Sequence, residues 1–138
     1  MYDLERISII IDDIKSYLDK LEKMKISSES DLKDDMKFYA SSMLIFSTLN
    51  RTIDLGDEIV KSDKMGYPLE IKEIFVLLSK NKVINKEMET KLRDLVIARN
   101  KLSHRYGMIK TKDVFNLTKD MKYVEKFLDD VLKHVNRK

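Results

Sequence analysis

The segment MLIFSTLNRTIDL, residues 43–55, decides the fold of this chain. Drawn as a helix, the segment is apolar on nearly every face, and Asn50, Arg51 and Asp54 are the main exceptions. A helix that is apolar all round is buried, so we expect these residues at the centre of a helical bundle. They belong to a helix predicted over about residues 30–62. Its expected core-facing stripe is Leu32, Met36, Tyr39, Met43, Phe46, Asn50, Ile53, Asp57 and Val60.

Four further helices are predicted around this central one from apolar residues spaced three and four apart. They span about residues 3–24, 68–80, 86–106, and from 111 to near the C-terminus. The expected caps and first residues are Ser28 or Ser30, Pro68, Asn85 and Thr111. Because all connections are short, we predict an all-α fold, an up-and-down antiparallel bundle of four to five helices. Residues 1–138 are expected to form a single domain.

Composition excludes several classes of function. The chain has no cysteine, which excludes disulfides, thiolate catalysis and zinc bound by cysteine, and which fits a cytoplasmic protein. Neither a signal peptide nor an apolar run of about 18–20 residues is present, so we expect no membrane association. The net charge of +3 does not by itself indicate a nucleic-acid-binding protein. A nucleic-acid site would therefore have to be a local patch.

The fourth predicted helix ends in ARNKLSHRYG, residues 98–107, where polar side chains interrupt the apolar pattern. Arg99 occupies a position that the spacing reserves for an apolar residue, and Tyr106 lies two turns further on. Asn100 and His104 are four residues apart and share the neighbouring face. These four residues are called the polar ledge below. The apolar seam that Arg99 and Tyr106 interrupt is Met88, Leu92, Leu95, Arg99, Leu102 and Tyr106.

Two interpretations of the polar ledge remain open at this point. In the structural one, cations complement the partial charge at the end of the helix, and Arg99 reaches solvent or pairs with a buried carboxylate such as Asp54. In the functional one, the Arg99 guanidinium binds a phosphate and His104 transfers protons. An arginine and a histidine suffice for RNA cleavage without a metal ion. A symmetric dimer would supply two of each to one phosphate.

The helix RDLVIARNKLSHRYG, residues 93–107, resembles the signature helix of the HepT-like branch of the HEPN superfamily. The branch has the pattern Arg-x4-His-x-Tyr, which falls on Arg99, His104 and Tyr106, with Asn100 after the arginine. The likeness continues in FYASSMLIFSTLNRTIDLGDEIV and GYPLEIKEIFVLLSKNKVI, residues 38–60 and 66–84. Two positions depart from the family pattern. Glu58 stands where many relatives carry histidine, and Ser103 where an aliphatic residue is common.

The resemblance implies a helical toxin ribonuclease of a toxin–antitoxin module, active as a homodimer, or a higher assembly, without a metal ion. Arg99 and His104 would be catalytic, and Asn100, Tyr106 and Asp54 would support them. The implied substrate is RNA, either tRNA or mRNA. The implied partner is an MntA-like minimal nucleotidyltransferase antitoxin, which transfers AMP to Tyr106 as an off switch.

Other polar groups favour structural roles. Asp54, Asp57 and Glu58 lie at spacing for a divalent cation, but no further ligand accompanies them, and we predict no metal and no cofactor. His134 is expected on the surface of the last helix near its C-terminus. The turn lysines favour solubility, with an RNA-backbone track as the alternative if they edge a cleft. Those lysines are Lys80, Lys82, Lys110 and Lys112.

The first hypothesis is therefore a metal-independent endoribonuclease. The alternative from another class is a non-catalytic helical module that binds RNA or nucleotide through the ledge and leaves it intact. A third is a purely structural helical adaptor, for which Arg99 would matter only for stability.

Overall fold

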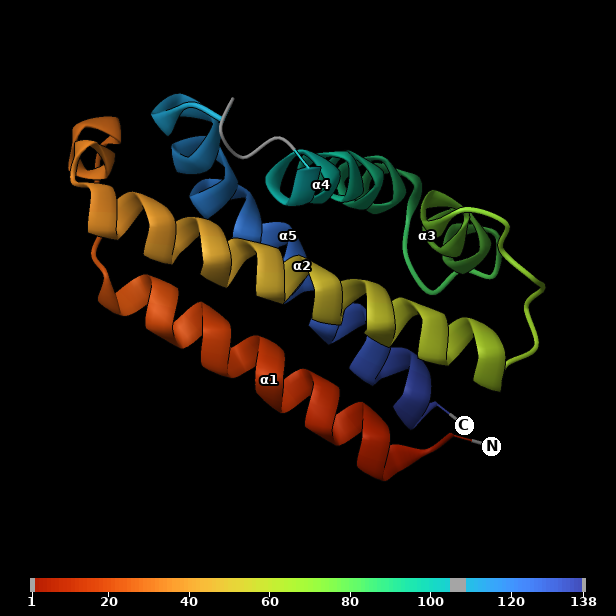
Figure 1. Cartoon of the computed structure of the whole chain (residues 1–138). Coiled ribbons are helices and arrows are strands. Elements are labelled where there is room, and N and C mark those ends of the chain that lie inside the picture. Colours follow the sequence, from red (N-terminus) through yellow and green to blue (C-terminus); the bar gives the residue numbers. More distant parts are fainter. Residues whose placement is uncertain (1, 105–108, 138) are drawn as a thin grey trace.

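The structure is a computed structural model that describes residues 2–104 and 109–137, and all regular structure in these ranges is helical (Figure 1). The predicted all-α bundle is confirmed. In chain order the elements are α1 (Leu4–Lys23), the 3-10 helix η1 (Glu29–Lys33), α2 (Asp35–Ser62), α3 (Ile71–Lys80), α4 (Lys86–His104) and α5 (Thr111–Asn136). Within the described ranges, no helix is both long and apolar enough to cross a bilayer.

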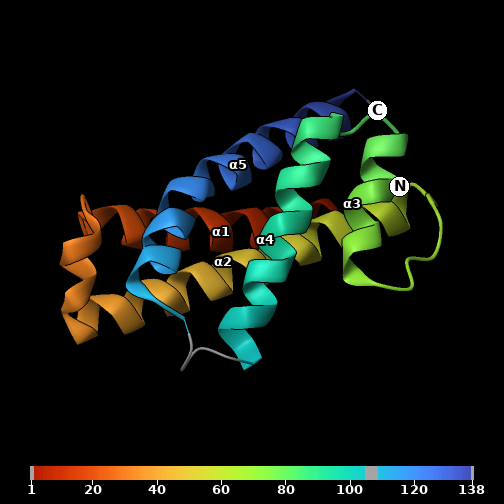
Figure 2. The same cartoon turned by 90° about the horizontal axis from the view of Figure 1, so that it is seen from above.

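Helix α2 is the centre of the bundle, as its apolar middle predicts. It contacts η1 and each of the other four described α-helices. In Figure 1, α1 lies along one side of α2, with α3 and α4 on the other. Figure 2 shows α4 crossing α2, so the beginning and the end of α4 lie on opposite sides of it. The end of α4 that carries the polar ledge is thereby separated from the chain termini, which lie close together (Figure 2).

Helix ends follow side-chain caps, and two of the predicted caps, Asn85 and Ser28, are confirmed. The Asn85 side-chain oxygen accepts a hydrogen bond of 2.8 Å from the Met88 backbone N–H, which satisfies a free donor in the first turn of α4. The helix predicted over 30–62 is two elements, because Asp34 is extended and caps α2 by accepting from the Lys37 N–H at 3.2 Å. Ser28 is the N-cap of the preceding η1.

One predicted helix start and one predicted cap are wrong. Pro68 lies in the connection before α3, which begins three residues later at Ile71. Thr111 is the first residue of α5 and does not cap it. Its hydroxyl instead donates to the Glu29 carboxylate at 3.0 Å and joins α5 to η1. Local sequence does not separate a cap from a tertiary contact of this kind.

The predicted core stripe of α2 is wrong over its first half. Met36, Tyr39 and Met43 are 82%, 57% and 62% exposed. Helix α2 carries two apolar stripes, and the bundle buries the stripe that was not predicted. Leu32 and Val60, the first and last residues of the predicted stripe, are buried as expected. The buried apolar residues of α2 are Ile45, Leu49, Leu55, Ile59 and Val60.

Gly56 is required where α2 meets α3. A Cβ at this position would lie 2.9 Å from the Cγ2 atom of Ile74. We expect Gly56→Val to lower the free energy of unfolding by about 3 kcal/mol, because overpacking a close contact forces the helices apart. Urea denaturation measures the change. Ala40→Val at an exposed position of α2 is the control and should cost about 0.5 kcal/mol. Equal effects of the two substitutions would contradict the close approach.

Candidate functional site

Three residues of the polar ledge, Arg99, Asn100 and His104, lie in the last turns of α4. Helix α4 extends to His104, so Asn100 and His104 lie one turn apart on one face. Asn100 is exposed, and its carbonyl accepts a hydrogen bond of 3.2 Å from the Ser103 hydroxyl. The side chain of His104 and the whole of Tyr106 lie outside the described residues.

Arg99 is a partly buried cation without a partner in the described part of the chain. The apolar members of its seam, Met88, Leu92, Leu95 and Leu102, are all buried, which confirms the seam. Among these neighbours the Nε atom of Arg99 is shielded from solvent and makes no hydrogen bond within residues 2–104 and 109–137. The Nε atom of Arg93 is also shielded and unpaired, but Arg93, like Arg6 and Arg51, forms an ion pair through its guanidinium. A buried polar atom left unpaired is costly, so the guanidinium is suited to receive an anion.

Asp54 pairs with a different arginine. Its carboxylate lies 3.2 Å from Nη1 of Arg51, and Arg51 also pairs with Asp13 of α1 at 2.8 Å. The ion pairs of the described residues include none between Asp54 and Arg99. The structure therefore does not bring Asp54 to Arg99, and the sequence suggested this contact only because the central part of α2 is so apolar.

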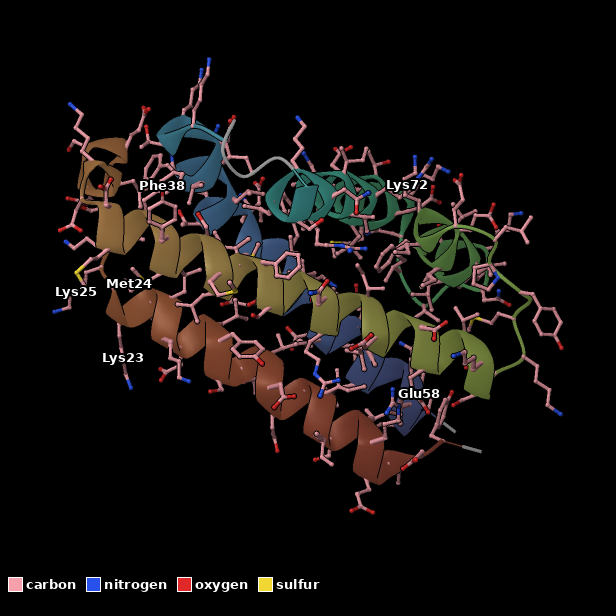
Figure 3. All side chains as sticks on the ribbon, in the orientation of Figure 1. Lys23, Met24, Lys25, Phe38, Glu58 and Lys72 are labelled. Carbon is pink, nitrogen blue, oxygen red and sulfur yellow. The ribbon has the colours of Figure 1, made fainter. Side chains whose placement is uncertain are left out.

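The other two carboxylates of the acidic cluster on α2 are also paired with cations. Asp57 lies 2.7 Å from Nζ of Lys61, and Glu58 lies 3.0 Å from Nε of Arg6. Figure 3 shows Glu58 on α2 at the side that faces α1. Within the described ranges, no three acidic or histidine side chains form a group suited to a metal ion. Glu58, which departs from the family pattern, thus serves to join α1 to α2.

His134 is not the surface residue that the sequence predicts. Its Nε2 atom lies 2.6 Å from the Asp63 carboxylate at the end of α2. The Tyr2 hydroxyl donates to the same carboxylate at 2.9 and 2.8 Å. Burial, together with the hydrogen bond and charge of Asp63, raises the pKa of Tyr2 to about 12. The periodicity of α5 placed His134 on a polar face, but the ends of α1, α2 and α5 converge over that face.

An apolar groove of about 390 Å³ adjoins the ledge. It is open to solvent and continues the exposed stripe of α2. The sequence placed Tyr39, Met43 and Phe46 of this groove in the core, so the groove was not predicted. The available signal was the presence of two apolar stripes on one helix, of which a single bundle can bury only one. The lining residues of this α2–α4 groove are Tyr39, Ser42, Met43, Phe46, Leu102 and Ser103.

Glu89 is a buried carboxylate that the sequence analysis did not identify. Its side chain is 3% exposed and pairs with Lys86 and Arg93 at 3.1 and 3.3 Å. Burial raises the pKa of Glu89, but hydrogen bonds from Lys86, Ser79 and Arg93 outweigh it and lower that pKa below its usual value. Because Ser79 belongs to α3, Glu89 ties the beginning of α4 to α3. In sequence it is one of many charged residues of α4.

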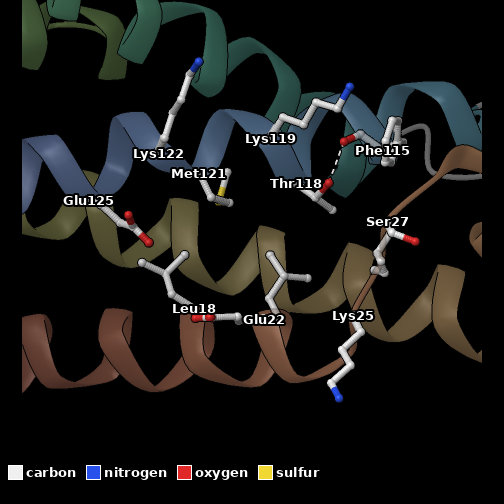
Figure 4. Close-up of a pocket in the computed structure, with 12 residues that line it drawn as sticks. Leu18, Glu22, Lys25, Ser27, Phe115, Thr118, Lys119, Met121, Lys122 and Glu125 are labelled. Carbon is white, nitrogen blue, oxygen red and sulfur yellow. Dashed lines mark hydrogen bonds between the residues drawn. The ribbon is translucent and has the colours of Figure 1, made fainter.

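A cavity of about 600 Å³ lies between the end of α1 and the first turns of α5 (Figure 4). Its rim mixes Lys25, Lys119 and Lys122 with Glu22 and Glu125. Side chains of both signs therefore line it, and no described ledge residue does. This cavity therefore shows no preference for one sign of charge.

The motif helix, the central helix and the order of elements agree with one family. A family model described as "Ribonuclease HepT-like" matches residues 10–131. The chain belongs to the HepT-like ribonuclease family. The resemblance to the HepT-like branch that the sequence suggested is thus confirmed. No match to a curated protein was found.

Solved structures share the HepT-like fold. A tri-AMPylated HEPN toxin of Shewanella oneidensis in complex with an MNT antitoxin is 23% identical, with a TM-score of 0.84 over 97% of this chain and 99% of that one. A toxin–antitoxin crystallised with AMP-PNP is 20% identical, with a TM-score of 0.84 over 93% and 97%. YutE of Bacillus subtilis, a cytosolic protein of unknown function, is 17% identical, with a TM-score of 0.85 over 99% and 94%. At these identities the likeness concerns the fold.

Proposed function

We propose that this chain is the ribonuclease toxin of a toxin–antitoxin pair and cleaves RNA as a homodimer without a metal ion. The observation that carries the proposal is the Arg99 guanidinium, partly buried on the family's motif helix and without an ion pair in the described part of the chain. Asn100, on the same turn, is exposed beside it and would help to position the RNA.

The proposed reaction is an internal transesterification of RNA. One His104 removes the proton of the ribose 2′-hydroxyl, whose oxygen attacks the adjacent phosphorus. The bond from phosphorus to the 5′-oxygen breaks, and the His104 of a second chain gives a proton to this leaving oxygen. Arg99 stabilises the extra negative charge on the phosphate in the transition state. The products are a 2′,3′-cyclic phosphate and a 5′-hydroxyl.

The exposed apolar stripe of α2 supports the dimer. One ledge carries one histidine, and the chain's other histidine, His134, is bound to Asp63 at the opposite end of the bundle. A second histidine at the same site would therefore come from a second chain. Tyr39 and Met43 are exposed and line the α2–α4 groove together with Leu102 and Ser103 of α4, so a second copy seated on this groove would cover them and bring the two ledges together.

We expect Met43→Glu to convert the dimer to a monomer, because a charge buried in an apolar interface is costly. Sedimentation velocity measures the oligomeric state. The control is Ile9→Glu, which places the same charge at an apolar position of α1 that is 52% exposed, and it should leave the dimer intact. A wild-type monomer, or a Met43→Glu protein that still dimerises, would contradict the interface.

The proposed off switch is AMP transfer to Tyr106 by an MntA-like nucleotidyltransferase antitoxin. The AMP group is bulky and carries negative charge. Attached seven residues after Arg99 on the motif segment, it would occupy the phosphate position and neutralise the guanidinium. A neighbouring solved toxin is tri-AMPylated in complex with its MNT antitoxin, which supports the same class of modification here.

The experiment that tests the proposed function is cleavage of RNA by the purified dimer in excess EDTA. The expected result is undiminished cleavage with cyclic-phosphate ends, and loss of cleavage after co-expression with the antitoxin, together with the mass of added AMP. Cleavage that needs a divalent cation would overturn the mechanism. RNA that is bound and stays intact would favour the non-catalytic binding module.

A further inference from the structure

A second cavity, of about 590 Å³, lies at the end of α4 opposite the polar ledge. One wall is the turn between α3 and α4, which carries Lys82 and leads into Lys86. The other wall is the end of α5, with Lys133, His134 and Arg137. Figure 2 shows this end of α5 beside the beginning of α4. Four lysine and arginine side chains, together with His134, thus line one cavity from two segments that are far apart in sequence.

Most of this positive charge is not neutralised. Lys82, Lys133 and Arg137 are exposed, and none of them forms an ion pair within the described ranges. Lys86 shares the buried carboxylate of Glu89 with Arg93. Among the described residues that line the cavity, one is acidic, Asp130, and it is paired with Lys126. The cavity therefore attracts anions although the whole chain has a net charge of only +3.

The two walls are held in place by interactions beneath the charged groups. Lys82 is in the left-handed region at φ 63°, where its N–H donates to the Ser79 carbonyl at 3.0 Å. Val83 and Ile84, which follow it, are buried. On the opposite wall, the bond to Asp63 holds His134 and with it the last turns of α5. The backbone is thus fixed, and the long basic side chains remain free to follow a ligand.

We infer that this cavity binds phosphates of the RNA substrate at a distance from the bond that is cleaved, an inference that rests on the proposed function. Exposed basic groups on two walls suit a strand that passes between them, because lysine and arginine track a phosphate backbone without reading its sequence. Lys86 and Arg99 are 13 residues apart on α4, or about 20 Å along the helix axis. A stacked strand carries one phosphate per about 3.4 Å, so about six phosphates span this distance.

The sequence offered, as an alternative, that four turn lysines form one track for the RNA backbone, and the structure separates these lysines. Lys82 lines the cavity at the end of α5, whereas Lys110 and Lys112 lie at the beginning of α5. Helix α5 is about 39 Å long, since each of its 26 residues adds about 1.5 Å. The partners of Lys82 are instead Lys133 and Arg137, which the sequence analysis did not connect with it.

The test measures binding of a single-stranded RNA of about 20 nucleotides whose 2′-hydroxyls are methylated, so that it cannot be cleaved. The double variant Lys82→Gln with Lys133→Gln removes one charge from each wall. We expect affinity to fall about tenfold at low salt, and the slope of log affinity against log salt to become shallower by about 1.4. The matched control, Lys15→Gln with Lys20→Gln, removes two exposed charges from α1 and should keep the wild-type affinity and slope.

Each other outcome overturns the inference. Equal weakening by the two double variants would mean that only net charge matters, and no weakening would mean that RNA does not reach the cavity. If the Lys82→Gln, Lys133→Gln variant lost binding of ATP but kept binding of RNA, the cavity would be a nucleotide pocket. The result is separate from the proposed function, because methylated RNA reports binding even if the wild-type chain cleaves no RNA.

Discussion

The Arg99→Ala variant is expected to cleave RNA about a thousandfold more slowly than the wild type, because removal of one preorganised group that stabilises transition-state charge has this order of effect. The loss should appear in kcat as well as in kcat/KM, since the guanidinium acts on charge that develops during the reaction. Thermal stability should change little, because Arg99 has no ion pair among residues 2–104 and 109–137 and its Nε atom is already unpaired.

Two control variants separate catalysis from charge and folding. Arg99→Lys keeps the charge but loses the planar fork of donors, so it should recover only a small part of the activity. Lys101→Ala removes an exposed cation from the same helix two residues away and should leave the rate unchanged. An Arg99→Ala protein that cleaves RNA normally would refute the proposed role, and a large fall in its melting temperature would favour the structural adaptor.

The His104→Ala variant is expected to lose cleavage by about a thousandfold, within the range found for general acid–base groups. Because the chain's imidazole at this position is proposed to move protons, added free imidazole should restore part of the activity of His104→Ala. The same addition should not restore Arg99→Ala, whose defect is in charge stabilisation. Single-turnover cleavage measured across pH provides both comparisons.

The experiments with His104→Ala and added imidazole can also contradict the mechanism. If His104→Ala keeps the wild-type rate and pH profile, another group moves the protons. If imidazole restores both variants equally, the rescue is a solvent effect and does not report the lost side chain. Circular dichroism establishes that both variants keep the helical fold before their rates are compared.

Much of the fold could be predicted because helical periodicity and capping are local. The seam of α4 repeats at intervals of three and four residues, so its burial follows from the sequence alone. Asn85 lies immediately before that pattern and caps it as expected. The same seam located Arg99 as a cation in an apolar position, and the family pattern supplied His104 and Tyr106 as its companions.

Only the tertiary structure decided which apolar stripe of α2 is buried. Both stripes have helical spacing, and the choice depends on where α1, α3 and α5 pack. For the same reason, Tyr39 and Met43 are exposed in the groove beside Leu102 and Ser103, and the sequence could not distinguish an exposed apolar surface from a core.

By itself, then, the sequence determined that there are five α-helices, the apolar seam of α4 and the polar residues Arg99 and Asn100 near its end. The partners of individual charged groups came only from the packing of helices: Asp54 with Arg51, His134 with Asp63, and Lys82 with the end of α5. The physical reason is that a helix specifies its own faces within a few residues. Which charge meets which depends on the crossing of whole helices, as with Lys82 and Lys133, which lie far apart along the chain and line one cavity.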